Sequence, residues 1–201
     1  MKKHFLIYTN YNKDPNGEIT QKVISYLQAK GQLCTKATCA DGGVMSAEEI
    51  PTDAFCMLVL GGDGTMLRAA RDTKEVNIPL IGINLGTLGY LTEIEPGGLE
   101  NALDKLIAGE YQMQSRMMLK GQVFDGEGAI KEERALNDIV ITRSGPLQIN
   151  KVRVYVNGQF LKDYDADGRG SLKDVEVSVL INEGTASSSE KATLFCSPMR
   201  S

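Results

Sequence analysis

The chain has 201 residues, 42% of them hydrophobic, which is enough for one large domain or two small ones with an apolar core. Its formal net charge of −4 argues against a general nucleic-acid-binding protein, because such proteins neutralise phosphates with clustered lysines and arginines. No apolar stretch approaches the roughly 20 residues that span a membrane, and the four cysteines lack Cys-x-x-Cys spacing, so we expect no membrane partner, no zinc site and a cytoplasmic protein.

The first half of the sequence alternates expected strands with expected helices. A strand is expected where apolar residues run almost without interruption, and a helix where they recur every three or four positions. The expected strands are residues 5–9, 33–38, 54–60 and 79–83, and the expected helices are residues 19–27, 64–71 and 99–107. This order predicts a doubly wound, mostly parallel α/β domain, in which ligands bind at the carboxyl ends of the strands.

The pattern changes after Gly109, where we place a domain boundary. Residues 112–124, 129–142 and 149–156 carry period-two alternation in places, with turns expected at Asp125-Gly126 and at Asn157-Gly158. We therefore expect an α/β domain over residues 1–109 and an incomplete antiparallel β domain over residues 110–168. Residues 169–201 match neither domain: 173–182 could form one more strand, and the polar stretch 183–201 is expected to be a frayed or disordered tail without a clear element.

The most informative motif is Gly61-Gly62-Asp63-Gly64-Thr65, between the third expected strand and the helix after it. Glycines let the backbone approach a bulky polar ligand, and the N–H groups at a helix N-terminus suit phosphate. A carboxylate is out of place there unless it does chemistry, holds a metal ion or binds a sugar hydroxyl. The alternative is a tight turn in which Asp63 merely caps the helix. The motif is neither a Walker loop nor a dinucleotide fingerprint, and it predicts a site for a nucleotide or another phosphorylated ligand.

The turn at residues 61–65 resembles the signature of a kinase superfamily that includes NAD kinases, diacylglycerol and sphingosine kinases and, more remotely, phosphofructokinases. Three further segments are similar to NAD kinases in particular: residues 84–91 (Asn-Leu-Gly-Thr-Leu-Gly-Tyr-Leu), 135–138 (Ala-Leu-Asn-Asp) and 163–168 (Asp-Tyr-Asp-Ala-Asp-Gly). The four segments occur in the family's order across about residues 2–168, and on these motifs the chain resembles the NAD kinase family.

The resemblance implies transfer of a phosphoryl group from ATP, or in some members from polyphosphate, to the 2′-hydroxyl of the adenosine ribose of NAD, which makes NADP. Mg²⁺ is expected with the donor, and the expected partners are small-molecule nucleotides. A homo-oligomer is expected too, more weakly here because the β domain is incomplete. A general base suits this phosphoryl transfer because an alcohol is a weak nucleophile. A carboxylate that accepts the hydroxyl proton raises the rate by about 10²–10⁴-fold.

The same resemblance implies roles for individual residues. Asp63 would be the general base that accepts the 2′-hydroxyl proton, with Gly64 beside it in contact with NAD. Asn137 and Asp138 would hold ribose hydroxyls and the nicotinamide end. The other expected ligand-binding residues are Gly61, Gly62 and Thr65 in the turn, Arg68 facing a phosphate, Tyr90 stacking near the ligand, and Asp165 and Asp167 from the β domain.

The chain departs from the family pattern after Asp167-Gly168. NAD kinases continue there into an apolar strand and a Thr-Gly-Ser-Thr-Ala-Tyr loop that grips NAD, whereas residues 169–173 are Arg-Gly-Ser-Leu-Lys and the loop sequence does not follow. Our hypothesis is that residues from about Arg169 onward are not native family sequence, as a truncated or frame-shifted gene would produce. A monomer with a cooperative melt and full NAD phosphorylation would refute it. Two alternatives stay open for this chain, an active kinase and an inactive one.

Two other functions share some of these features. A lipid kinase of the diacylglycerol or sphingosine type would use the same turn but would need an apolar cleft, and the Asn137-Asp138 pair would have no role. A non-catalytic nucleotide-binding remnant would bind NAD without making NADP. The alternating acids at 163, 165 and 167 faintly resemble a calcium loop, but the bidentate acid at the end of such a loop is missing.

Overall fold

The structure, a computed structural model, describes most of the first half of the chain and several strands of the second. The described residues are 2–37, 45, 50–86, 89–92, 94–116, 118–125, 128–136, 150–156, 159–166, 175–179 and 191–195. The chain divides into two compact units, one made of Met1–Asn137 with Ser189–Ser201 and the other of Asp138–Ser188.

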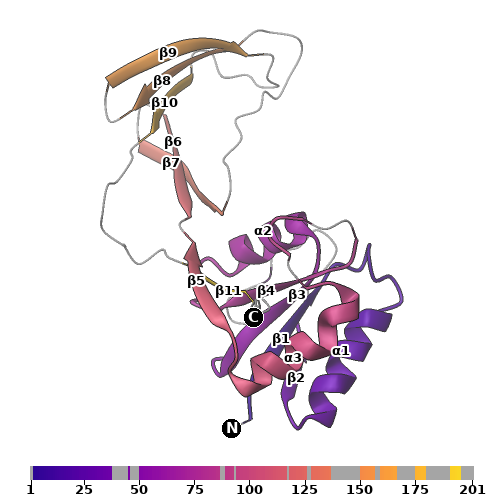
Figure 1. Ribbon diagram of the computed structural model, residues 1–201. Coiled ribbons are helices and arrows are strands. Elements are labelled where there is room, and N and C mark those ends of the chain that lie inside the picture. Colours follow the sequence, from indigo (N-terminus) through magenta and orange to yellow (C-terminus); the bar gives the residue numbers. More distant parts are fainter. Residues whose placement is uncertain are drawn as a thin grey trace, which may run out of the picture. The chain divides into compact units, whose positions relative to one another are not determined.

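The first unit is built on a six-stranded sheet with the order β2-β1-β3-β4-β11-β5 (Figure 1). Its strands are β1 (His4–Thr9), β2 (Leu33–Lys36), β3 (Ala54–Gly61), β4 (Leu80–Asn84), β5 (Gln112–Arg116) and β11 (Lys191–Phe195). The strands from β2 to β4 pair parallel with their neighbours, which confirms the expected mostly parallel α/β architecture. β5 pairs antiparallel with β11, and β11 pairs with β4 at one position, Thr193 beside Leu80.

The last two strands of the sheet order, β11 and β5, differ from the sequence-based expectations. The first unit extends past Gly109 to Asn137, because β5 joins the same sheet through β11. β11 also lies inside residues 183–201, where the sequence predicts no regular element, so that expectation is corrected for Lys191–Phe195. A short strand of mixed polarity is recognisable only through a pairing partner, and here the partner lies far away in the sequence.

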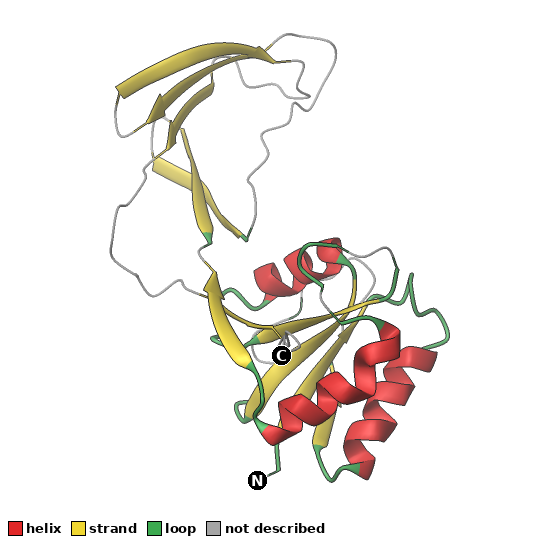
Figure 2. Cartoon of the chain, viewed as in Figure 1, coloured by secondary structure: helices red, strands yellow, loops and turns green. Residues whose placement is uncertain are grey.

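Among the described residues, three α-helices cover both faces of the sheet (Figure 2). Helices α1 (Glu18–Ala29) and α3 (Leu99–Ala108) pack on one face, with a short 3-10 turn, η2 (Pro96–Gly98), before α3, and α2 (Asp63–Asp72) packs on the other. In β1, Phe5 and Ile7 pack with α1 and α3, whereas Leu6 and Tyr8 pack with α2. A strand that is covered on both faces is apolar at consecutive positions, which explains the unbroken apolar runs of the sequence.

Helix α1 begins after Gly17, whose φ of 67° is the left-handed conformation that glycine favours. The Asp14 carboxylate accepts hydrogen bonds from the N–H groups of Ile19 (3.2 Å) and Thr20 (2.9 Å) and from the Thr20 hydroxyl (2.7 Å). These bonds satisfy donors that a helix start would otherwise leave unpaired. Burial by itself would raise the pKa of Asp14, but the hydrogen bonds together hold that pKa below its ordinary value.

The expected β-hairpins are present on either side of the predicted turns. In the first unit, β6 (Leu119–Asp125) and β7 (Gly128–Ala135) pair antiparallel. In the second unit, β8 (Asn150–Val156) pairs antiparallel with β9 (Gln159–Ala166) and parallel with β10 (Val175–Val179). The strand predicted at 173–182 therefore contains β10, whereas residues 137–142 of the strand predicted at 129–142 lie outside the described residues.

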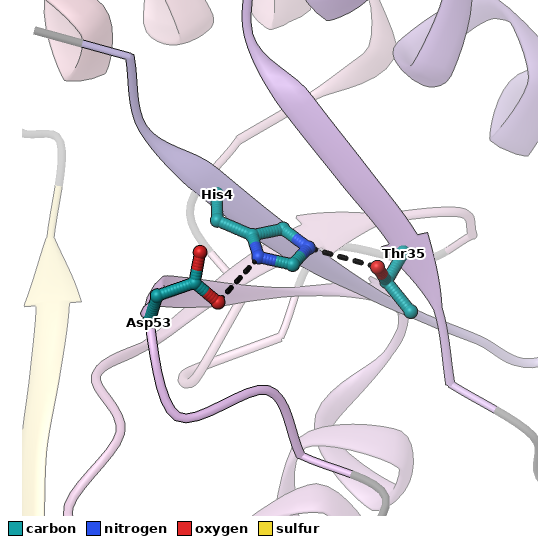
Figure 3. Close-up of polar contacts among 3 residues, drawn as sticks. All are labelled: His4, Thr35 and Asp53. Carbon is teal, nitrogen blue, oxygen red and sulfur yellow. Dashed lines mark hydrogen bonds and ion pairs between the residues drawn. The ribbon is translucent and has the colours of Figure 1, made fainter.

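At the amino ends of the central strands, polar side chains bond to one another. His4, the first residue of β1, has Nδ1 2.8 Å from a carboxylate oxygen of Asp53 and Nε2 2.8 Å from the hydroxyl of Thr35 (Figure 3). Because an ionised carboxylate can only accept, the N–H at Nδ1 donates to Asp53. His4 therefore links β2 to the residue just before β3, across the strand that lies between them.

Candidate functional site

The candidate site lies at the carboxyl ends of β3 and β4, the edge at which parallel α/β sheets bind ligands. Gly61, the last residue of β3, is in register with Asn84, the last residue of β4. The Asn84 side chain shapes the segment that follows: its oxygen accepts the Gly86 N–H at 3.1 Å, and its amide donates to the Gly86 carbonyl at 3.0 Å. The structure thus brings together the 61–65 turn and the start of the 84–91 segment, as the sequence predicts.

Gly61 and Thr65 pack against each other inside the turn. A Cβ added to Gly61 would lie 2.2 Å from the Thr65 hydroxyl oxygen, which no real contact tolerates. The same oxygen accepts a hydrogen bond from the side-chain amide of Asn10 at 3.0 Å and a longer one from the Gly62 N–H at 3.4 Å. Gly61 and Thr65 therefore shape the turn itself, and their role in binding a ligand stays a prediction.

Asp63 is the first residue of α2, and its carboxylate bonds to the segment after β4. Oδ2 accepts the N–H of Tyr90 at 2.8 Å, and Oδ1 accepts the N–H of Leu91 at 2.9 Å. Gly89 lies against the same group, since an added Cβ would fall 2.1 Å from Oδ1. The interpretation of Asp63 as a cap of its own helix is therefore wrong. Two backbone bonds orient the carboxylate, and because it has about four lone-pair positions it can still accept from a ligand.

Gly64, Arg68 and Tyr90 are exposed at this edge. A Cβ added to Gly64 would meet no heavy atom within 4 Å, so the packing of the protein does not require glycine there. Arg68 follows one helical turn later. Tyr90 is 94% exposed, and its backbone N–H is the group that binds Asp63. All three residues are accessible to a ligand, and their binding roles stay predictions.

Lys13 belongs to this edge, although the sequence analysis does not single it out. Its ammonium nitrogen lies 2.8 Å from the position of a Cβ added to Gly62 and 3.0 Å from one added to Gly86. The ammonium group therefore lies beside both glycine-bearing segments. One signal could have found it: Lys13 follows the first expected strand by four residues, and loops after parallel strands begin at the ligand-binding edge.

The remaining predicted site residues lie outside the described residues or in the second unit. Asn137, Asp138 and Asp167 lie outside the described residues. Asp165 lies in β9 of the second unit, where its backbone pairs with Lys151 of β8. Their binding roles stay predictions, as does the origin of the segment after Gly168.

Elsewhere in the described residues, the calcium-loop alternative finds no support. Both carboxylate oxygens of Asp163 accept hydrogen bonds from the Arg153 guanidinium, at 2.8 Å and 3.1 Å, and this bonding raises the pKa of Arg153. No group of three or more histidine, cysteine or acidic residues is placed to hold a metal ion in the described part of the chain. Nor do the helices described there include one with the length and apolar character needed to cross a membrane.

Comparison with known proteins identifies the family. A family model described as the ATP-NAD kinase N-terminal domain matches residues 7–111, just over half of the chain. The chain is 42% identical over 172 residues to the NAD kinase of Lachnospira eligens and 44% identical over 170 residues to that of Agathobacter rectalis, and each match covers 83% of this chain and 59% of the relative. The chain therefore spans about three fifths of the length of these curated relatives.

A solved structure of yeast NADH kinase in complex with NADH matches with a TM-score of 0.67 and 18% identity, covering 83% of this chain and 56% of that chain. A likeness at this identity bears on the fold alone, and it agrees with the α/β class expected from the sequence. The resemblance to NAD kinases is confirmed by the family model and by relatives that carry that name. The chain belongs to the family of ATP-NAD kinase N-terminal domains.

Proposed function

We propose that this chain carries the phosphoryl-transfer site of an NAD kinase, which phosphorylates the 2′-hydroxyl of the adenosine ribose of NAD to make NADP. Membership of the family and the names of the relatives support this reaction. The single observation that carries the proposal is the half-buried Asp63 carboxylate at the carboxyl end of β3, oriented by the N–H groups of Tyr90 and Leu91. ATP is the proposed donor, with polyphosphate as its alternative.

In the proposed reaction, Asp63 accepts the 2′-hydroxyl proton as the bond between the 2′-oxygen and the γ-phosphorus of ATP forms. The bond from that phosphorus to the β–γ bridging oxygen breaks, and ADP leaves with the electron pair. Asp63 suits this role because its hydrogen bonds come from neutral N–H groups, which orient the carboxylate without neutralising its charge. A general base in position contributes about 10²–10⁴-fold to the rate.

Gly64 supports the placement of a ligand next to Asp63. Glycine in a helix costs up to about 1 kcal/mol relative to alanine. An added Cβ at this position would meet open space, so the fold does not explain the glycine. A ligand that approaches the backbone closely does explain it, and we assign this space to the ribose of NAD.

The family implies a magnesium ion that binds with the phosphoryl donor. Kinases hold Mg²⁺ with one or two carboxylates together with the substrate phosphates, rather than with a full set of protein ligands. Asp63 presents carboxylate oxygens that can accept more than the two bonds described at this edge, so its chemistry fits an ion that arrives with the phosphates. When bound, the ion neutralises phosphate charge during the transfer.

The other predicted residues complete the proposal on the strength of the family resemblance. They are Gly61, Gly62 and Thr65 in the turn, Arg68 toward a phosphate, Tyr90 near the ligand, and Asn137, Asp138, Asp165 and Asp167 toward NAD. A cytoplasmic location and a homo-oligomer are proposed on the same ground.

The proposal is tested by incubating the chain with Mg-ATP and NAD and measuring NADP with an NADP-specific dehydrogenase. We expect NADP to form, and we expect the Asp63→Asn variant to form it at least ~100 times more slowly while it still binds NAD. Calorimetric titration with NAD separates binding from chemistry. A folded chain that binds NAD but makes no NADP would contradict the kinase proposal and favour a nucleotide-binding remnant. An unchanged rate in Asp63→Asn would contradict the role of Asp63.

A further inference from the structure

The loop that carries Lys13 is attached to the 61–65 turn by hydrogen bonds. The backbone N–H of Asn10 donates to the Leu60 carbonyl at 2.9 Å, and its side-chain amide donates to the Thr65 hydroxyl at 3.0 Å. Within the loop, the Asn10 carbonyl accepts the Lys13 N–H at 2.9 Å, and the Asn10 side-chain oxygen accepts the Asn12 N–H at 3.1 Å. The backbone of Lys13 is therefore held next to the turn, and its position does not depend on the reach of a flexible side chain alone.

Asp14, the acid next to Lys13 in the sequence, bonds to the start of α1 instead of to Lys13. Asp14 is only 4% exposed, and its carboxylate accepts three hydrogen bonds from the first turn of α1. None of the described carboxylates, Asp63 included, forms an ion pair with Lys13. Within the described part of the chain, the Lys13 ammonium group therefore has no counter-charge.

The surroundings of Lys13 favour the binding of an anion. Its ammonium nitrogen lies beside Gly62, the residue that precedes the ten-residue helix α2. A helix start carries partial positive charge and N–H groups that have no partner within the helix. An anion bound at this point would interact favourably with the ammonium group and with the helix start at once. The exposed ammonium group is open to such an anion from solvent.

We propose that Lys13 binds the phosphate chain of the phosphoryl donor and holds the terminal phosphate next to Asp63. This inference rests on the proposed function, because it assigns the donor side of that reaction. As the 2′-oxygen bonds to the terminal phosphorus, Asp63 takes the hydroxyl proton, and the shortened donor leaves with the electron pair of the broken P–O bond. Lys13 keeps its proton throughout and offsets negative charge on the phosphate oxygens, a role that lysine fills as a point charge.

The test compares two lysine variants with the same change of charge. Lys13→Met removes the proposed contact, whereas Lys22→Met removes an exposed ammonium group on α1 that pairs with Glu100 at 3.1 Å. Calorimetric titration with tripolyphosphate and, separately, with a non-hydrolysable ATP analogue, both with Mg²⁺, measures donor binding without turnover. We expect Lys13→Met to lose ~10-fold or more in affinity, Lys22→Met to match the wild type, and Lys13→Arg to recover part of the loss.

The two probes distinguish the two donors. A loss that depends on Lys13 for both probes assigns the contact to the phosphate chain that they share, and a loss for the analogue alone assigns it to ATP. Equal affinities of Lys13→Met and Lys22→Met for both probes would overturn the proposal. The proposal would also be overturned if Lys13→Met lowered the affinity for NAD by the same factor as the affinity for the donor and lowered the melting temperature as well. A purely structural residue has that signature. Since the titrations need no turnover, they can support the role of Lys13 even where the chain makes no NADP.

Discussion

Polar side chains have different surroundings at the two ends of the parallel sheet. At the amino end, His4, Thr35 and Asp53 bond to one another within the protein. At the carboxyl end, the Asp63 carboxylate accepts two backbone hydrogen bonds from described residues and has lone pairs beyond those two, and Lys13 has no ion pair with any described carboxylate. The polar groups of the amino end thus connect strands, whereas those of the carboxyl end can still bond to a ligand.

Two lysines show the same contrast. Lys3 donates to the Leu106 carbonyl in the last turn of α3 and lies 4.3 Å from the centre of the Phe55 ring. A helix end carries partial negative charge, so this cation is stabilised by the protein itself. Lys13 lies instead beside the start of α2, where the partial charge is positive. Lys3 thus has protein partners at one end of the sheet, whereas the exposed Lys13 at the other end is proposed to bind an anion.

The largest expected effect separates two aspartates, one at each end. Asp63→Asn removes the proposed base, so we expect kcat for NADP formation to fall by about 10²–10⁴-fold. Asp53→Asn makes the same chemical change at the amino end, and there we expect kcat to stay unchanged while the melting temperature falls. Steady-state kinetics and thermal melts measure both. A comparable fall of kcat in Asp53→Asn would break the comparison between the two ends.

A smaller effect separates two glycines of the turn. Gly61→Ala would force a Cβ against the Thr65 hydroxyl, and we expect the free energy of unfolding to fall by about 1–3 kcal/mol. Gly64→Ala adds a Cβ in open space on a helix, so we expect the free energy of unfolding to stay equal or to rise by up to about 1 kcal/mol, while NAD affinity falls. Denaturant melts and NAD titrations test this pair. Equal destabilisation by the two substitutions would remove the reason for placing a ligand at Gly64.

His4→Ala tests the amino end directly. The substitution removes the hydrogen bonds to Asp53 and Thr35, and since Asp53 is largely exposed we expect a loss of only about 1 kcal/mol in the free energy of unfolding. The affinities for NAD and for the ATP analogue are expected to match the wild type. Denaturant melts and titrations on one preparation measure both quantities. A selective loss of ligand affinity would mean that the amino end also serves the site.

The smallest expected effect concerns acid stability through Asp14. Burial favours its neutral form, but the Thr20 and Ile19 hydrogen bonds hold the folded-state pKa below the ordinary value. The ionised group therefore stabilises the fold at pH values above the ordinary pKa of an aspartate, and this contribution is lost as the pH falls through the lower folded-state pKa. We expect Asp14→Asn to lose less stability than the wild type between roughly pH 5 and pH 2, with little change at neutral pH because asparagine also caps helices.

Denaturant melts across that pH range test the role of Asp14. An identical acid dependence in the wild type and in Asp14→Asn would mean that α1 does not hold this carboxylate. Asp14 would then be available to neutralise Lys13, and the contrast between Lys13 and Lys3 would weaken.

Local sequence predicted most of the first unit because its elements have regular burial. The strand expected at 54–60 is β3, Ala54–Gly61, and the helix expected at 99–107 is α3, Leu99–Ala108. A strand covered on both faces and a helix covered on one each leave a distinct apolar pattern. The 61–65 turn could also be predicted, since glycines between a strand and a helix mark backbone freedom at a known edge of the sheet.

Other features depended on partners that are distant in the sequence. β11 is short and lies in a polar stretch of the sequence, and its strand is defined by pairing with β5 and with β4. Lys13 could be assigned to the candidate site only because it lies beside Gly62 and Gly86, which belong to two other loops. The packing of the fold requires glycine at position 61 but not at position 64, and a motif in which both are glycine does not show this difference.

The fold class, the family and the edge of the sheet where the site is predicted could be inferred from local sequence, because neighbouring residues set both the burial pattern and the freedom of the backbone. Three features became visible only in the folded chain: Tyr90 and Leu91 orient Asp63, His4 links β2 to the residue before β3, and Lys13 lies beside the turn without a described counter-charge. These contacts join loops and strands that are many residues apart, and their geometry exists only once the strands have taken their register in the sheet.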